Sequence, residues 1–287
     1  MSKFIGVLLV LLSATAFGIM PFLTQIAYHS GVGLISLLFL RFLIAAVVVG
    51  AIALVQKQPL PDAPRRLRLV LVGGVGFVAQ SLSFYGALLL LNPGLAVLLL
   101  YLYPSFVCLI ESIAHRQRLQ LRQWTALALS FCGLVLVVGA QWENELLGLA
   151  LGVGSAIVYA VYVILGGAIL RESSLIGGGA IAFGSAAVMF GSMVLIDEIR
   201  LPQNSSGWLA VVAIALVCTV VAIGALFAGI NRLGAPVASV LSSWEVVVTS
   251  GLAAILFGEA MAIVQLIGGG LILWAVLLLA KSGESDE

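Results

Sequence analysis

The sequence predicts an all-α integral membrane protein with ten transmembrane helices, arranged as two inverted five-helix repeats. Two observations lead to this prediction. First, 62% of the 287 residues are hydrophobic and only 9% are charged, with a mean hydropathy of +1.23, which excludes a soluble globular protein of ordinary composition. Second, apolar runs long enough to cross a bilayer recur along the whole chain, separated by short polar breaks.

Each predicted helix follows from the thickness of the membrane. A hydrocarbon core of about 30 Å needs roughly 20 apolar residues in a helix that rises about 1.5 Å per residue. Five such runs fill the first half of the chain: residues 4–28, 34–55, 67–91, 94–114 and 121–140. The third and fourth runs are separated only by a turn at Asn92, Pro93 and Gly94. Five more runs fill the second half: residues 146–170, 176–196, 207–231, 235–257 and 261–280.

The basic residues give the orientation of these helices, because cytoplasmic loops carry an excess of Lys and Arg. Ten helices place both termini on one side of the membrane. If that side is the cytoplasm, Arg200 lies outside and Arg41 lies within a helix, and the other basic residues are cytoplasmic. Those residues are Lys3, Lys57, Arg65, Arg66, Arg68, Arg116, Arg118, Arg122, Arg171, Arg232 and Lys281. We therefore expect a multi-pass protein of the cell (inner) membrane with both termini cytoplasmic.

The chain also contains an internal repeat. At a shift of 142 residues, identical residues coincide in several helices without a gap. The aligned pairs include Gly6 with Gly148, Ser13 with Ser155, Leu91 with Leu233 and Gln123 with Gln265. Each half holds five helices, an odd number, so the second half must enter the membrane from the opposite side. We expect a first repeat over residues 1–141, a second, inverted repeat over 142–281 and a cytoplasmic tail over 282–287.

This architecture favours transport over catalysis. Two halves of opposite topology can exchange inward-open and outward-open shapes around a site near the midplane, a recurrent plan of secondary transporters. No G-x-x-x-x-G-K-[ST] loop occurs in the sequence, so ATP hydrolysis is not expected. His29 and His115 fall at loop edges, no paired acids occur and the three cysteines are widely spaced. We therefore expect no enzyme and no bound metal or cofactor.

The stretch "SVLSSWEVVVTSG", residues 239–251, places Glu245 in the middle of an apolar run. Glu245 lies about ten residues, or roughly 15 Å, along the ninth helix, which is near the bilayer midplane. An ionised acid at that depth costs at least about 2.5 kcal/mol, so it should face the protein interior or a water-filled cavity. Ser242 and Thr249 share its helix face, and Trp244 lies beside that face, where it can shape a ligand site.

Three roles for Glu245 stay open. It can bind the cationic amine of a substrate, exchange a proton during transport, or only hold neighbouring helices together. Arg41 is its obvious charge partner, but the second helix runs inward from about Leu34, which places Arg41 in the outer third of the membrane. Snorkelling of Arg41 to the outer headgroups is the leading interpretation, against a buried ion pair or the binding of a substrate carboxylate.

Matching helices of the two halves should line a cavity between them. Phe17 in the first helix has its counterpart in Tyr159 of the sixth helix, and Tyr101 lies in the middle of the fourth. Gln80 and Phe84 form a mixed polar and aromatic patch on the third helix. Any one of these aromatic residues taken alone can simply pack between helices. Together with the polar face of the ninth helix, they indicate a mid-membrane pocket for a small, partly apolar solute.

Three longer motifs stand within the plan of five plus five inverted helices: "LRFLIAA", "GALLLLNPGLAVLLLYLYPSFV" and "GAPVASVLSSWEVVVTSGLAAILFGE". Together with that plan, they resemble the EamA family of the drug/metabolite transporter superfamily. The family's frequent "leP" motif falls on residues 102–104 in the first half and on 244–246 in the second, which keeps the acid and lacks the proline. The closing "GE" is present at Gly258 and Glu259 and reads Arg116 and Gln117 in the first half.

The resemblance implies an exporter of amino acids, other metabolites or drugs. We expect a secondary active transporter that exports small amphipathic metabolites such as amino acids by alternating access. Drug or other metabolite efflux is the alternative, and a channel or a non-transporting partner subunit is a further one. The expected partners are a small-molecule substrate, the lipid bilayer and protons as coupling ion. No nucleic-acid partner is expected, and the sequence leaves the oligomeric state open.

Overall fold

The structure is a computed structural model of the 287-residue chain. It describes residues 2–58, 61–115, 121–139, 145–170, 175–196, 198–233, 238, 241–242, 244–257 and 263–282. Over these residues the chain forms helices and no strands, so the predicted all-α class is confirmed. In the first half the elements are α1 (Ser2–His29), α2 (Leu34–Val55), α3 (Ala63–Leu69), η1 (Val70–Gly76), α4 (Phe77–Leu90), α5 (Pro93–Leu100), α6 (Tyr103–His115) and α7 (Leu121–Gly139).

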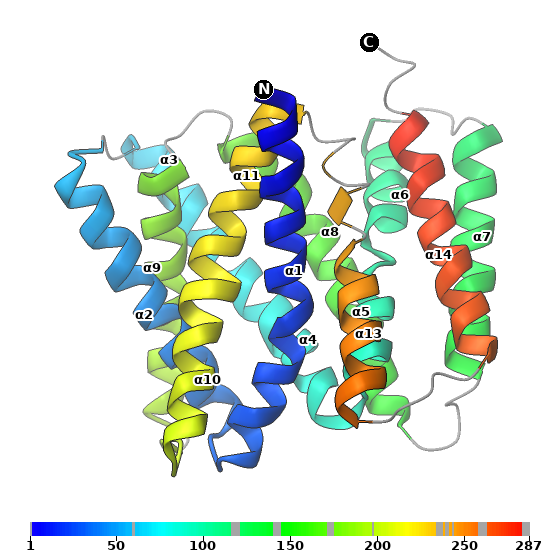
Figure 1. The fold of residues 1–287 in the computed structure, drawn as a ribbon. Helices are drawn as coiled ribbons and strands as arrows, with labels where there is room; N and C mark the ends of the chain where they lie inside the picture. The colour runs from blue at the N-terminus through cyan, green and yellow to red at the C-terminus, as the bar shows by residue number, and fades with distance from the viewer. Residues whose placement is uncertain are drawn as a thin grey trace.

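The second half repeats much of this order. Its elements are α8 (Leu146–Leu170), α9 (Leu175–Val194), α10 (Ser205–Ala215), η2 (Leu216–Val221), α11 (Ala222–Leu233), α13 (Trp244–Phe257) and α14 (Ile263–Ser282). Figure 1 shows the helices standing side by side in one bundle, with α1 and α8 running in opposite directions along it. The start of α1 and the end of α14 lie at the same end of the bundle.

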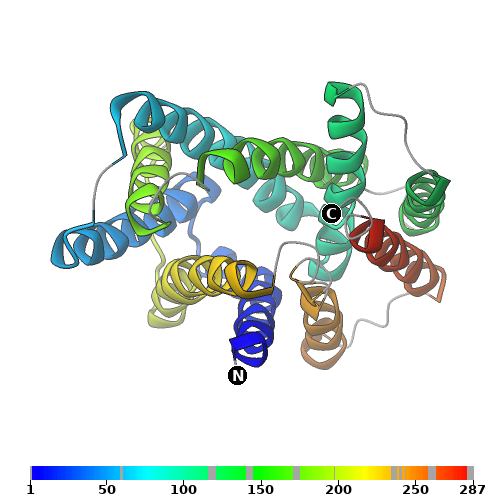
Figure 2. The same ribbon diagram turned by 90° about the horizontal axis from the view of Figure 1, so that it is seen from above.

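The helices pair across the two halves. The most extensive contacts join α2 to α9, α1 to α11, α4 to α8 and α7 to α14. Seen from above in Figure 2, α2 and α9 lie at one end of the elongated bundle, and α7 and α14 lie together at the other. Each pair joins one element of the first half to one element of the second half. The pair α1 and α11 is the counterpart of the pair α8 and α4, because α8 occupies in the second half the place of α1, and α11 the place of α4. The two halves therefore form a single packed body.

Three of the predicted membrane helices are not uniform α-helices. The third contains the π-helical segment η1, with the sequence "VLVGGVG", and the eighth contains the π-helical segment η2 at the corresponding place in the second half. The fourth is interrupted at Tyr101 and Leu102, between α5 and α6. Pro104 lacks a backbone N–H and cannot continue the hydrogen-bond ladder of α5, so a new helix begins at Tyr103. The membrane helix predicted over 94–114 corresponds to the apolar span Pro93–Ala114, which contains this break.

The turn predicted around Asn92 is confirmed. The Asn92 side chain accepts a hydrogen bond from the Leu95 backbone N–H at 2.8 Å and so caps the first turn of α5. Pro93 follows at the first helical position, where its missing N–H costs nothing. These two residues separate the third membrane helix from the fourth.

At the end of the bundle opposite the N-terminus, two loops are joined by backbone hydrogen bonds. The Gly33 N–H donates to the Arg200 carbonyl at 3.2 Å, and the Gln203 N–H donates to the Ser30 carbonyl at 2.9 Å. The Arg200 N–H also donates to the Ser36 hydroxyl at 2.9 Å. Gly31 adopts a φ of 85°, a left-handed conformation that glycine takes without steric cost. The residues that lead from α1 to α2 and from α9 to α10 thus hold this end together.

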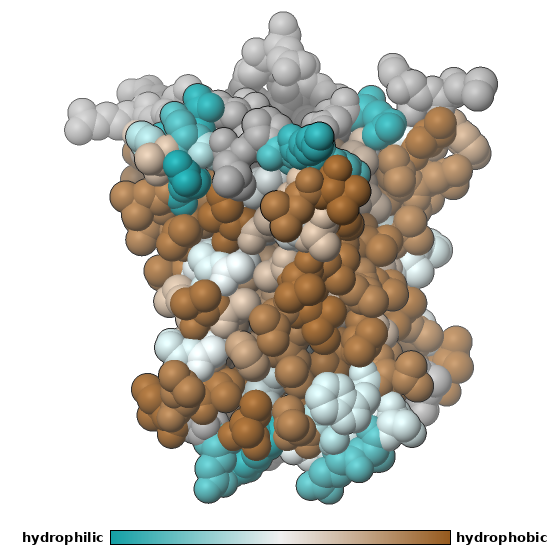
Figure 3. Space-filling view, turned by 90° about the vertical axis from the view of Figure 1, so that its left-hand side faces the viewer, coloured by the Kyte–Doolittle hydropathy of each residue, from teal (hydrophilic) through white to brown (hydrophobic). Residues whose placement is uncertain are grey.

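The surface is that of a membrane protein. Figure 3 shows a broad hydrophobic band between hydrophilic residues at the two ends of the molecule. Among the described residues, six helices are long and apolar enough to cross a membrane. Three shorter apolar helices, Leu121–Leu136, Leu146–Tyr162 and Leu266–Ala275, lie at positions where the sequence predicts further membrane helices. A multi-pass membrane protein is therefore established.

Candidate functional site

Glu245 lies in the first turn of α13 and contacts the interrupted fourth helix of the other half. The Tyr101 hydroxyl lies 2.9 Å from Glu245 Oε2 and also within hydrogen-bonding distance of the Ser242 carbonyl oxygen. Tyr101 is 3% exposed, whereas Ser242 and Glu245 are half-buried. Because α5 ends at Leu100, Tyr101 stands at the break of the helix, from which its ring reaches the second half. The structure thus brings together three residues that the sequence predicts for one site.

The helix face that carries Glu245 is turned into the protein. Thr249 is fully buried, and its hydroxyl donates to the Gly18 carbonyl of α1 at 3.1 Å. Ala238 is also buried, and its carbonyl accepts a hydrogen bond from the Ser242 hydroxyl at 2.9 Å. The inward orientation predicted from the spacing of these residues is confirmed.

A row of tyrosine rings leads away from this site. Tyr101 contacts the ring of Tyr103 at a centroid distance of 6.1 Å, and Tyr103 contacts Tyr159 of α8 at 4.8 Å. Tyr159 stacks on Tyr162 at 6.1 Å, and Tyr162 packs against Phe77 of α4 at 4.7 Å. Among these residues the sequence predicts Tyr101 and Tyr159 as site residues. The tyrosine row connects them to a cavity that begins at Tyr162 and Phe77.

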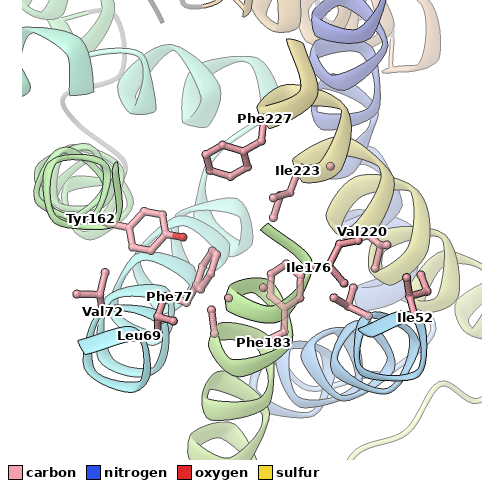
Figure 4. A pocket seen from close by; sticks show the side chains of 16 residues that line it. Ile52, Leu69, Val72, Phe77, Tyr162, Ile176, Phe183, Val220, Ile223 and Phe227 are labelled. Carbon is pink, nitrogen blue, oxygen red and sulfur yellow. The ribbon is translucent and has the colours of Figure 1, made fainter. Parts of the chain in front are cut away.

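The cavity has a volume of about 220 Å³ and lies between helices of both halves. Figure 4 shows the rings of Tyr162, Phe77, Phe183 and Phe227 around it. Its other lining residues are Val49, Ile52, Leu69, Val72, Gly73, Ile176, Gly178, Gly179, Ala182, Val220, Ile223 and Gly224. The Tyr162 hydroxyl is the polar side-chain group of this lining. The wall of the cavity therefore suits an apolar or aromatic group of a ligand. Among the described residues, it contains no charged side chain that could bind a charged group.

The ends of the helices place this cavity in the half of the bundle that carries the basic loops. Val49 and Ile52 lie in the last turns of α2, which ends at Val55 just before Lys57. Ile176 lies in the first turn of α9. The two loops that are joined by the backbone hydrogen bonds of Arg200 and Gln203 lie at the opposite ends of α2 and α9.

An aromatic layer forms the inner limit of the cavity. Phe42 of α2 packs against Phe77 at 5.5 Å, against Phe183 at 6.3 Å and, stacked, against Phe190 of α9 at 5.7 Å. Phe42 and Phe190 are completely buried, whereas Phe77 and Phe183 face the cavity. We call these four rings the phenylalanine layer. It separates the cavity from the polar residues that lie deeper along α2.

Arg41 lies directly behind the phenylalanine layer, with its guanidinium 5.0 Å from the Phe42 ring centroid. Its Nε donates to the Thr219 hydroxyl and its Nη1 to the Tyr85 hydroxyl, both at 2.8 Å. Only 6% of Arg41 is exposed, so the interpretation that it snorkels to the outer headgroups is wrong. Burial is possible because two hydroxyls and two aromatic faces solvate the guanidinium.

The sequence reasoning missed both hydroxyl partners of Arg41. Thr219 lies in η2, where its hydroxyl also donates to the Ile214 carbonyl at 2.9 Å. Tyr85 is 1% exposed and stacks below the guanidinium at 5.2 Å. A polar Thr and a Tyr in the middle of apolar runs are the sequence signal that could have found them.

Arg41 and Glu245 do not form an ion pair with each other. Among the residues that the structure describes, the ion pair is Arg65 with Asp62, at 3.6 Å on the surface. The same residues contain no cluster of three metal-ligating side chains. The motif residues Arg116, Gln117, Gly258 and Glu259 lie outside the described part of the chain.

The remaining predicted residues lie away from the cavity. Trp244 is 45% exposed, and its indole N–H donates to the Thr15 hydroxyl at 3.2 Å. Phe84 is 1% exposed and packs edge-on against Tyr85 at 5.9 Å. Gln80 and Phe17 are half-buried. None of the nine residues predicted for the site lines the cavity of Figure 4, since that lining is apolar apart from the Tyr162 hydroxyl.

Known proteins match two thirds or more of this chain. An uncharacterized transporter of Bacillus subtilis, YcbK, is 27% identical over 288 residues, which cover 92% of this chain and 89% of that protein. An uncharacterized transporter of Archaeoglobus fulgidus is 26% identical over 196 residues, or 68% of this chain and 70% of that protein. A solved crystal structure aligns with a TM-score of 0.68 over 97% of this chain and 96% of that chain at 20% identity, which shows a shared fold.

The sequence also matches one family twice. The sequence model of the EamA-like transporter family matches residues 4–139 and, a second time, residues 146–281. The two matches begin 142 residues apart, which is the shift that aligns Gly6 with Gly148. Because the two matches together cover almost the entire chain, the protein belongs to the EamA-like transporter family and is a membrane transporter.

Proposed function

We propose that the protein is a secondary active transporter that exports small amphipathic metabolites, amino acids especially, by alternating access. The observation that supports this most is the aromatic cavity of about 220 Å³ between helices of both halves. A cavity of that kind accepts the apolar body of a solute, and its position between two repeats is where the access of a carrier to either side can change.

Alternating access requires two repeats of opposite orientation. We assign residues 1–141 and 142–281 to them, followed by the tail 282–287. The opposite directions of α1 and α8 in Figure 1 and the pairing of α1 with α11 and of α8 with α4 support this assignment. The conformation described here then has its cavity toward the basic end of the bundle and its other end closed by the loops at Gly33 and Arg200.

The basic loops define the sides of the membrane. With Lys57, Arg65 and Arg66 in the cytoplasm, both termini are cytoplasmic, the protein lies in the cell (inner) membrane and its cavity faces inward. An exporter collects its substrate from that side. The direction of transport in this proposal therefore agrees with the end at which the cavity lies.

Two buried charges serve the polar parts of the substrate and the coupling ion. Arg41, which has hydroxyl partners and lies behind the phenylalanine layer, is our candidate for the substrate carboxylate. Glu245 is our candidate for the residue that binds the coupling proton, with Tyr101 and Ser242 beside it.

The wall of the cavity supports a second candidate function, the efflux of uncharged drugs, because it offers apolar surface and no charge.

Flux in proteoliposomes tests the proposal. The full chain is reconstituted, and uptake of radiolabelled amino acids is measured with and without a pH gradient and with unlabelled substrate inside the vesicles. Saturable uptake that internal substrate accelerates supports a carrier, because a channel shows no such counterflow. Unsaturable flux identifies a channel, and the absence of flux for every amino acid contradicts amino acid export. Parallel assays with apolar dyes then test the drug-efflux alternative.

A further inference from the structure

The Tyr101 hydroxyl has more acceptor neighbours than it has hydrogens. Its oxygen lies 2.9 Å from Glu245 Oε2 and within hydrogen-bonding distance of the Ser242 carbonyl oxygen. A phenol carries one hydrogen, a backbone carbonyl carries none, and an ionised carboxylate carries none. A single hydrogen serves both acceptors only as a shared, three-centre hydrogen bond. A hydrogen on the carboxyl group of Glu245 instead gives each of the two contacts a hydrogen of its own.

We infer that this conformation is the proton-loaded state of Glu245, and that Tyr101 is the positioning residue that links the proton to the contact between the two halves. The Glu245 carboxyl donates its hydrogen to the Tyr101 oxygen, and the Tyr101 hydroxyl donates to the Ser242 carbonyl. Both hydrogens in this chain of three groups then have an acceptor. The effect of this proton on transport rests on the proposed function, whereas the presence of the proton does not.

The surroundings of Glu245 agree with a neutral acid. Among the described residues, the titratable groups that interact electrostatically with Glu245 are the phenols of Tyr101, Tyr103 and Tyr159 and the thiol of Cys218. Among the described residues no cation lies within ion-pair distance of its carboxyl group, since the guanidinium of Arg41 is held by Thr219 and Tyr85. No described cation near Glu245 therefore compensates a negative charge there, and the Tyr101 hydroxyl is the described side-chain donor that an ionised Glu245 would have.

Loss of the proton changes the hydrogen bonds of Tyr101. An ionised carboxylate is a stronger acceptor than a backbone carbonyl, so the single hydrogen of Tyr101 turns from Ser242 to Glu245. The Ser242 carbonyl then loses its partner from the first half. Because Tyr101 belongs to the fourth membrane helix and Ser242 to the ninth, release of the proton weakens a contact across the interface of the two halves. Proton binding and the packing of the halves are coupled in this way.

Infrared spectroscopy tests the proton directly and needs no substrate. The purified full chain in lipid nanodiscs is titrated from acidic to alkaline buffer, and spectra of the wild type are compared with those of Glu245→Gln. Gln carries an N–H that donates to Tyr101 as the protonated acid does, so this variant keeps the geometry. We expect a carbonyl stretch of a protonated carboxylic acid that is present near neutral pH, is lost in alkali and is absent in Glu245→Gln. Absence of such a band from the wild type near neutral pH overturns the inference.

The role of Tyr101 is tested with a matched pair of variants. Tyr101→Phe removes the hydroxyl that accepts from Glu245, and we expect the carboxylic acid band to shift in frequency. Tyr103→Phe removes a neighbouring phenol whose ring contacts Tyr101, and we expect the band to stay in place. A band that Tyr101→Phe leaves unmoved, or that both variants move equally, contradicts a specific bond between Tyr101 and Glu245.

Transport measurements then separate this inference from the proposed function. With the amino acid that gives flux, Glu245→Gln should lose uptake driven by a pH gradient. Counterflow and gradient-driven uptake that both persist in Glu245→Gln overturn the coupling by Glu245, even if the infrared band is present. If no amino acid is transported, the proposed function fails, whereas the infrared result on the proton still decides the inference.

Discussion

Gly6 of α1 packs directly against Leu233 at the end of α11, and a Cβ atom on Gly6 would lie only 2.8 Å from Leu233 Cγ. The second half makes the same contact with the roles of the halves exchanged. A Cβ on Gly148 would lie 2.9 Å from Leu91 Cγ, and both residues are shifted by 142 from the first pair. The glycine lets two helix backbones approach closely at each end of the interface between the halves.

These two contacts should respond alike to substitution. Gly6→Val and Gly148→Val each force bulk into a filled contact, so we expect each to lower the free energy of unfolding by about 1–3 kcal/mol. Gly154→Val on the same helix as Gly148 is the control, because a Cβ there meets no atom within 4 Å. Unfolding followed in mixed micelles gives the three values. Equal stability of Gly148→Val and Gly154→Val would show that the close approach is not needed.

The N-caps of the third and eighth membrane helices give a second comparison. The Asn204 side chain accepts a hydrogen bond from the Gly207 N–H at 2.8 Å, and it caps α10. Its counterpart Asp62 precedes α3 without a capping bond. We expect Asn204→Ala to cost about 1 kcal/mol of unfolding free energy and Asp62→Ala at most about 0.5 kcal/mol, the value of a surface ion pair. The same unfolding assay measures both, and a larger loss in Asp62→Ala would contradict the difference in capping.

The cavity can be filled without a clash. Gly224 lines it, and a Cβ at this position would meet no atom within 4 Å. We expect Gly224→Leu to fold normally and to reduce flux at least about tenfold, a loss that corresponds to about 1.4 kcal/mol of binding free energy. Gly251→Leu, which also meets open space but lies outside the cavity lining, should transport as the wild type does. Normal flux through Gly224→Leu would place the substrate elsewhere.

Arg41 should be required as an arginine. A lysine keeps the charge but has no planar fork that reaches Thr219 and Tyr85 together. We expect Arg41→Lys to raise the KM for amino acids about tenfold or more, since a hydrogen bond to a charged group contributes about 1.5–3 kcal/mol. The KM for the corresponding amino acid amides, which lack the carboxylate, should change little. An equal change for acids and amides would assign Arg41 to helix packing.

The proposed orientation predicts which loops a membrane-impermeant maleimide reaches. Single cysteines at Lys57 and Ser205, both exposed, are introduced into a variant in which Cys108, Cys132 and Cys218 are alanine. We expect Ser205→Cys to be labelled in intact spheroplasts and Lys57→Cys only in inverted vesicles. The reverse pattern would place the termini outside and turn the cavity toward the exterior.

The sequence alone predicted the features that depend on local composition and helix periodicity. Long apolar runs predicted the membrane helices, and the spacing of Ser242, Glu245 and Thr249 predicted the inward-facing side of the ninth one. The repeat was visible at a shift of 142 because identical residues recur along both halves. Each of these signals lies within one helix or within an ungapped alignment, so no knowledge of neighbouring helices was needed.

Only the tertiary structure decided which side chains meet. Arg41 and Thr219 are 178 residues apart, and Tyr101 and Glu245 are 144 apart. Periodicity tells which face of a helix is polar but not which helix packs against that face. Arg41 was therefore assigned to the headgroups, although two distant hydroxyls hold it in the interior. The apolar cavity carried no signal for the same reason, because a Phe that lines a cavity and a Phe that fills a core read alike in a sequence, and only packing leaves the space between them empty.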